Sequence, residues 1–162
     1  MQLVDAIENS GLAIWVRESP SIFAYTSILA LHAMGLAVVV GLNWMVALRV
    51  LRGTAGAPFP PLQKLFAWMF AGFWINAASG LVLLAAALSR MLDSTTFFFK
   101  LGFVALAMIN LRLFKMRVFD RLDASAGDAL PASARKFAIA SLLLWGCAIA
   151  AGRLVSYPGI FG

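Results

Sequence analysis

Charged residues are scarce in this sequence. Of its 162 residues only 12% are Asp, Glu, Lys or Arg, whereas 62% are hydrophobic. A soluble domain of this size cannot bury so much apolar surface, so lipid must cover the excess. A net charge of +6 would suggest nucleic acid as a partner in a soluble protein, but here the basic residues lie in short stretches between long apolar runs. The composition therefore predicts an integral membrane protein with the lipid bilayer as its partner and no nucleic acid.

Cysteine and histidine each occur once. Cys147 alone cannot form a disulfide within the chain. His32 is the only imidazole, although a transmembrane haem is usually held by two axial ligands. No acidic residue lies within an apolar run, and no nucleophile has a base at a readable spacing. The sequence therefore argues against an enzyme acting alone.

Four apolar runs are long enough to cross a hydrocarbon core of about 30 Å. Ser19 and Pro20 suit the start of the first helix, and a loop rich in proline and glycine separates it from the second. The third run contains Lys100 and Arg112, whose aliphatic stems can reach the membrane boundaries. The sequence predicts an all-α bundle that forms a single domain over residues 1–162. Its expected spans are about 21–48, 63–89, 95–117 and 136–156.

The ends of the chain and its loops predict how it lies in the membrane. Apolar and polar residues alternate over about 2–17 as in an amphipathic helix lying in the membrane interface, and the acidic N-terminus favours retention over a cleavable signal peptide. Basic residues concentrate beside the first and third loops, which places those loops in the cytoplasm and both termini in the periplasm of a bacterial inner membrane. Those loops and their flanks hold Arg49, Arg52, Lys64, Arg112, Lys115, Arg117, Arg121, Arg135 and Lys136, against Arg17, Arg90, Lys100 and Arg153 on the other side.

His32 is the outstanding candidate for function. It lies about eleven residues, or roughly 16 Å, below the expected start of its helix, close to the midplane of the membrane. An ionisable side chain at that depth is costly and indicates either function or interhelical packing. Its helical face should face protein, and includes Tyr25, Leu29, Leu36, Val39 and Asn43.

Asn76 is the predicted partner of His32. Counting from Lys64 places it at a similar depth on the second span. Gly72 and Gly80 lie four residues to either side, so the three residues form a small-residue face against which another helix can pack closely. Asn110 on the third span and Ser141 on the fourth are weaker candidates for polar contacts.

Lys100 and Arg153 form a second candidate site. Both are expected near the periplasmic boundary, where they suit an anionic group such as a lipid headgroup, a carboxylate or a haem propionate. Plain snorkelling of the two side chains to the interface is the alternative.

Two cofactors remain open on these residues. A b-type haem would take His32 as one axial ligand and a methionine such as Met69, or His32 of a second copy, as the other. Copper could use His32 with soft ligands, although the methionines show no cluster at ligand spacing. The candidate soft ligands are Met34, Met69, Met108 and Cys147.

Several short pieces, taken in order, resemble an uncharacterised family of four-helix bacterial membrane proteins. They are SILALHAMGLA (27–37), LRVLRG (48–53), AGFW (71–74), SGL (79–81), FKL (99–101), SLLLW (141–145) and AGRL (151–154). The resemblance implies no established activity, but its pattern singles out His32, Lys100, Asn110 and Arg153. The layout is also distantly similar to copper-resistance D-type and cytochrome b561-like proteins. The latter would imply haem, yet they use paired histidines and this chain has only His32.

The sequence therefore leaves three hypotheses of function. The first is a non-catalytic binding or interaction subunit that packs with itself or with a larger membrane complex and holds a lipid or quinone near Lys100 and Arg153. The second is a haem or copper protein in which His32 is a ligand and Asn76 orients it. Small-solute transport is the third, although no discontinuous helix or inverted repeat is visible.

Overall fold

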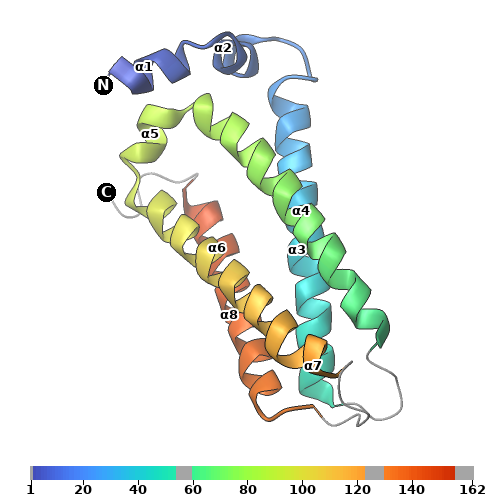
Figure 1. The fold of residues 1–162 in the computed structure, drawn as a ribbon. Coiled ribbons are helices and arrows are strands. Elements are labelled where there is room, and N and C mark those ends of the chain that lie inside the picture. Colours follow the sequence, from blue (N-terminus) through green and yellow to red (C-terminus); the bar gives the residue numbers. More distant parts are fainter. Residues whose placement is uncertain (1, 54–59, 123–129, 156–162) are drawn as a thin grey trace. The chain divides into compact units, whose positions relative to one another are not determined.

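The computed structural model describes residues 2–53, 60–122 and 130–155, and over this part of the chain all regular secondary structure is helical (Figure 1). The all-α fold is thus confirmed. Four helices among these residues are long and apolar enough to cross a membrane, which supports a multi-pass membrane protein. These spans are Tyr25–Arg52, Lys64–Ala85, Thr95–Phe119 and Ser133–Leu154.

The described residues form a series of helices. In chain order they are α1 (Gln2–Glu8), α2 (Gly11–Glu18), α3 (Tyr25–Arg52), α4 (Pro60–Ala85), α5 (Leu88–Leu92), α6 (Thr95–Phe114), the π-helix η1 (Lys115–Phe119), α7 (Asp120–Leu122) and α8 (Ser133–Leu154). Part of the loop before α4 and the expected helix stop at Pro158 and Gly159 lie outside the described residues.

The N-terminal amphipathic segment forms two helices where the sequence predicts one. The hydroxyl of Ser10 donates a hydrogen bond to the carbonyl oxygen of Ile7, at 2.7 Å, and its oxygen accepts one from the backbone N–H of Ala13, at 3.4 Å. Ser10 thereby ends α1 and is the N-cap of α2. A serine that bonds the backbone on both sides favours a break over a continuous helix.

The first spanning helix begins at Tyr25, four residues later than expected. Ser19 is the C-cap of α2 instead of the N-cap of α3, because its N–H bonds the carbonyl oxygen of Trp15. The hydroxyl oxygens of Ser19 and Ser21 then accept bonds from the N–H groups of Ser21 and Phe23, each at 3.2 Å. These local side-chain bonds compete with helical ones and delay the start of the helix.

The chain divides into two compact units, and α3 and α4 each contribute to both. The first unit comprises Met1–Val39 and Phe70–Thr95, and the second comprises Val40–Met69 and Thr96–Gly162. Each candidate contact described below lies within one unit.

In the first unit, α1 contacts the short helix α5. The carboxylate of Glu8 accepts hydrogen bonds from the backbone N–H and the hydroxyl of Ser89, both at 2.8 Å. These bonds favour the ionised form and lower the pKa of Glu8, the backbone bond contributing most. The N-terminal segment is thus tied to the end of the second span.

In the second unit, aromatic rings pack around η1. The ring centroid of Phe119 lies 5.0 Å from that of Phe66 and 5.2 Å from that of Phe114, and Phe114 stacks on Phe137 at 5.9 Å. Phe114 and Phe119 are five residues apart, which is the hydrogen-bonding period of a π-helix. The wider turn therefore places both rings in the buried core.

Candidate functional site

His32 lies half-buried in the first unit, on α3, beside Asn76 of α4. Its ring nitrogen Nδ1 is 2.8 Å from the backbone carbonyl oxygen of Asn76. A carbonyl oxygen can only accept, so Nδ1 carries the proton and donates it. In the neutral imidazole this tautomer places the lone pair on Nε2.

A second hydrogen bond runs in the opposite direction, from Asn76 to His32. Its side-chain Nδ2 donates to the backbone carbonyl oxygen of His32 at 2.7 Å. Nδ2 also lies 3.3 Å from Nδ1 of His32, but both atoms are donors in this tautomer, so that contact is not a hydrogen bond. Each side chain therefore bonds the main chain of the other helix, and the predicted pairing of His32 with Asn76 is confirmed.

Ser79 completes this cluster and was missed by the sequence analysis. It is buried, and its hydroxyl oxygen lies 3.4 Å from Nδ1 of His32. The hydroxyl donates to the carbonyl oxygen of Ile75 at 2.6 Å, within its own helix. The available signal was its position three residues after Asn76, which places both on one face of a helix.

The glycines of this region allow the two helices to approach closely. A Cβ atom on Gly35 of α3 would lie 2.6 Å from the backbone nitrogen of Asn76 and 2.7 Å from the carbonyl oxygen of Gly72. A Cβ atom on Gly80 would lie 2.9 Å from Cε1 of His32. The predicted small-residue face of α4 is thus confirmed as the surface on which α3 and the imidazole pack.

The predicted face of α3 is only partly directed toward protein. Val39 and Asn43 are buried as expected, but Tyr25 and Leu29 are 53% and 41% exposed, and in this the prediction was wrong. The contact at Gly35 fixes the rotation of the helix. Leu29 lies about 120° around the helix from Gly35, so its side chain points away from α4.

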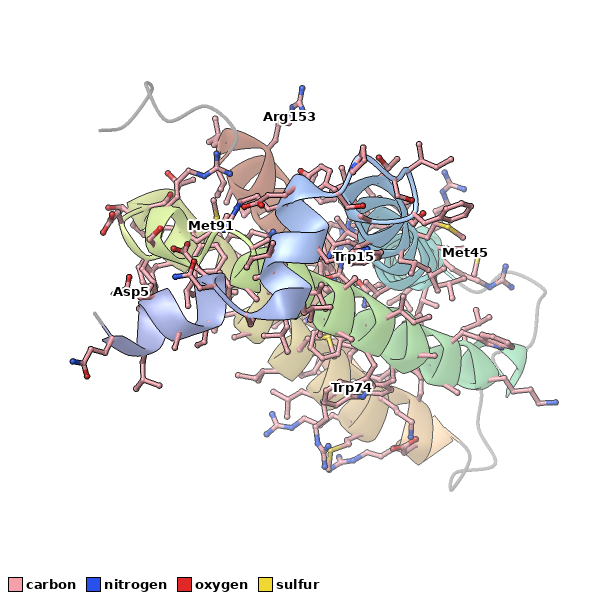
Figure 2. The ribbon with its side chains drawn as sticks, turned by 90° about the horizontal axis from the view of Figure 1, so that it is seen from above. Asp5, Trp15, Met45, Trp74, Met91 and Arg153 are labelled. Atoms are coloured by element: carbon pink, nitrogen blue, oxygen red, sulfur yellow. The ribbon has the colours of Figure 1, made fainter. Side chains whose placement is uncertain are left out.

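In the second unit, the start of α6 packs against the end of α8. The stem of Lys100 covers Gly152, with Cε 3.4 Å, Cδ 3.6 Å and Nζ 3.8 Å from the position that a Cβ atom would take there. The next residue, Arg153, is exposed, and Figure 2 shows its side chain directed away from the helix. Lys100 and Arg153 are therefore at the same end of this helix pair, as expected. Their role in binding stays a prediction.

Asn110 and Ser141 join the same two helices further along. Asn110 donates from Nδ2 to the hydroxyl oxygen of Ser141 at 2.8 Å and to the carbonyl oxygen of Phe137 at 3.2 Å. Both polar side chains are buried. These weaker sequence candidates thus form the polar contact between α6 and α8.

The structure offers few ligands for a metal ion. Over the described part of the chain, no group of three or more His, Cys, Asp or Glu residues is placed to hold one. Cys147 is exposed and Met69 is fully buried. Haem or copper binding at His32 stays a prediction. Such a site would need further ligands from other residue types, such as methionine, or from a second copy of the chain.

Comparisons of the chain with protein-family models, with curated proteins and with solved structures find no match. The family resemblance of the short sequence pieces stays a prediction. Function must therefore be inferred from the contacts of the two candidate sites.

Proposed function

We propose that this protein is a non-catalytic membrane subunit, in which polar residues join the helices of the chain and apolar helix faces bind lipid and other membrane proteins. The pairing of His32 with Asn76 carries this proposal. Both side chains donate to a backbone carbonyl oxygen of the opposite helix, at 2.8 and 2.7 Å. Membrane proteins use polar side chains in this way to hold helices together.

The second unit supports the same conclusion. Asn110 donates to Ser141, so a polar pair again links two apolar helices. Hydrogen bonds of this kind satisfy polar groups that would otherwise lie unpaired in hydrocarbon. Asn110 and Ser141, which the sequence singled out as candidates for polar contacts, thus take part in helix packing.

The outer faces of the spanning helices are strongly apolar. On α4 the large exposed residues include Trp68, Trp74, Ile75 and Leu81. Only 17% of the most apolar stretch of this helix is buried. Exposed apolar surface of this extent marks contact with a membrane or a protein partner. We infer that these faces receive lipid, a second copy of the chain, or a larger membrane complex.

The test is purification in a mild detergent, followed by light scattering on a size-exclusion column and mass spectrometry of the same peak. We expect a defined homo-oligomer, or a copurifying protein or lipid in constant ratio to the chain. A monodisperse monomer that carries neither lipid nor partner would overturn the proposal.

One observation favours a second candidate, a membrane redox protein. Histidines that bind metals usually donate their other ring N–H to a carbonyl or carboxylate, as His32 does through Nδ1 to Asn76. We propose as the alternative that His32 supplies Nε2 to a b-type haem or to copper, which would carry electrons. Since the chain has one histidine, a bis-histidine haem would need His32 from two copies.

Spectroscopy separates the two candidates. An ultraviolet–visible spectrum of the oxidised and dithionite-reduced protein, with elemental analysis for iron and copper, would show a Soret band or stoichiometric metal in a redox protein. His32→Ala should abolish either signal, whereas Asn110→Ala, which removes a polar contact in the second unit, should leave it intact. A colourless and metal-free sample would refute the redox proposal.

A further inference from the structure

Lys100 is a half-buried cation of the third span. It lies five residues after the start of α6, or about 8 Å along the helix axis, and is half-buried. Among the described residues no carboxylate lies within ion-pair distance of its ammonium group. Lys115, near the other end of the same span, pairs with Asp120 at 2.7 Å. A cation partly removed from water favours an opposite charge beside it.

Gly152 lets Lys100 pack closely on α8, next to a second cation. Because Gly152 has no side chain, the stem of Lys100 covers its backbone, and Nζ lies 3.8 Å from the position that a Cβ atom would take. Arg153 follows directly, one residue before the end of α8, and is exposed. Two cations thus lie at this end of the α6–α8 pair.

The surface of α6 on either side of Lys100 is apolar and open. Phe99 and Leu101 each lie about 100° around the helix from Lys100 and are 62% and 46% exposed. These side chains lie within the spanning helix Thr95–Phe119 and adjoin the charged group in sequence. A ligand that matches this surface therefore has a negative head and a hydrocarbon body.

We propose that Lys100, Gly152 and Arg153 form a binding site for an anionic phospholipid. The phosphate lies beside the end of α8 and accepts hydrogen bonds from Lys100 and Arg153, and the acyl chains run along exposed apolar side chains of α6. A free phosphate ion would use the same two cations but none of the apolar surface. The site rests on the proposed function only in that the chain lies in a membrane, and is independent of the roles of His32 and Asn76.

Native mass spectrometry of the full chain in detergent tests the site. The protein is mixed with phosphatidylglycerol, or with phosphatidylcholine of the same acyl chains, and retained lipid is counted. We expect one tightly held phosphatidylglycerol. Its affinity should fall about tenfold in Lys100→Gln and in Arg153→Gln, since a charge-assisted hydrogen bond is lost. Lys115→Gln is the matched control and should bind as the unmodified chain does.

A further variant and a competing anion separate a lipid site from a folding defect and from a phosphate site. Lys100→Arg keeps the charge and should retain phosphatidylglycerol, which shows that a loss in Lys100→Gln is not a folding defect. Equal binding of the two lipids, or an equal fall in Lys100→Gln and Lys115→Gln, would overturn the site. If millimolar inorganic phosphate displaces the lipid, the site binds a free anion and not a phospholipid. None of these outcomes alters the oligomeric state or the copurifying partners on which the proposed function is tested.

Discussion

At the scale of single residues, the first unit uses two side chains to make two separate bonds. His32 and Asn76 do not bond each other's side chains; each bonds a backbone carbonyl oxygen of the opposite helix. Carbonyl oxygens have two lone pairs, so these atoms can keep their helical hydrogen bonds as well. Loss of one side chain therefore leaves the other bond intact and orphans no carbonyl.

This geometry predicts additive effects. His32→Phe keeps a ring of similar shape and Asn76→Leu a side chain of similar size, and each removes one interhelical bond. We expect each to lower the free energy of unfolding by about 1 kcal/mol, in the usual range for such bonds in membranes. Because the two bonds share no donor or acceptor, the double variant should lose the sum to within about 0.5 kcal/mol, as sites without shared partners do. Unfolding in sodium dodecyl sulfate, followed by circular dichroism, measures all three; a larger coupling would contradict two independent bonds.

The pairing of His32 with Asn76 could be predicted because depth follows from counting residues along a helix. Ser79 and the bond between Asn110 and Ser141 could not be predicted, since these contacts depend on how each helix is rotated about its axis. That rotation is set by close contacts such as Gly35 against Gly72. A single sequence gives the residues of a face but not the helix that the face meets.

At the scale of elements, the approach of α3 to α4 depends on bare backbone. Gly35→Ala would place a Cβ atom 2.6 Å from a backbone nitrogen of α4. The positions of both atoms are fixed by the backbone, so no side-chain rotation can relieve the clash. We expect a loss of about 1–3 kcal/mol in unfolding free energy. Gly41→Ala, on the same helix with nothing within 4 Å of the added atom, should be neutral or stabilise by up to about 1 kcal/mol. Equal effects of the two substitutions in the same unfolding assay would contradict the close crossing.

The contact between α1 and α5 should depend on pH. Hydrogen bonds from Ser89 lower the pKa of Glu8, so ionised Glu8 stabilises the contact. This contribution is complete above the ordinary carboxyl pKa of about 4.3 and is lost as the pH falls through the lowered value. A spin label at Leu3→Cys, with Cys147→Ser, should become more mobile over that acidic range.

The same label separates this contact from general acid effects. In Glu8→Gln it should be mobile at neutral pH and change little on acidification. Glu18→Gln removes only the exposed pair with Arg17 and should behave like the parent protein. If the mobility of the label in the parent protein does not change with pH, the bonds of Glu8 to Ser89 do not hold α1 against α5.

The presence and approximate position of the spanning helices could be predicted from the lengths of the apolar runs. In hydrocarbon every backbone N–H and C=O group must be hydrogen-bonded within the protein, and a helix achieves this. Helix ends were less predictable because they depend on competing local bonds. Ser10 divides the N-terminal segment, and the serines before Tyr25 delay α3. The π-helix at Lys115–Phe119 has no signature in the apolar pattern, because it accompanies a contact with another helix, that of Phe119 with Phe66 of α4.

At the scale of the whole molecule, the four candidate spans among the described residues predict that both ends of the chain lie on the same side of a membrane. The excess of basic residues beside the first and third loops predicts that this side is opposite the cytoplasm. A membrane-impermeant maleimide should label Leu92→Cys in intact cells, and Met116→Cys only after permeabilisation, both in a Cys147→Ser background. Neither substitution alters a charge. The reverse pattern would invert the orientation, and labelling of both in intact cells would contradict a span between them.

The π-helix also determines how the chain would tolerate a change in length. A one-residue deletion inside an ordinary helix rotates everything beyond it by about 100° and removes its buried face from the core. Within Lys115–Phe119, a deletion would convert the wide turn to an ordinary one, and Phe119 would become the fourth residue after Phe114, still on the same face. The ring contacts of Phe119 with Phe66 and Phe114 would persist. This short segment is therefore the part of the third span where shorter variants can arise without loss of the core.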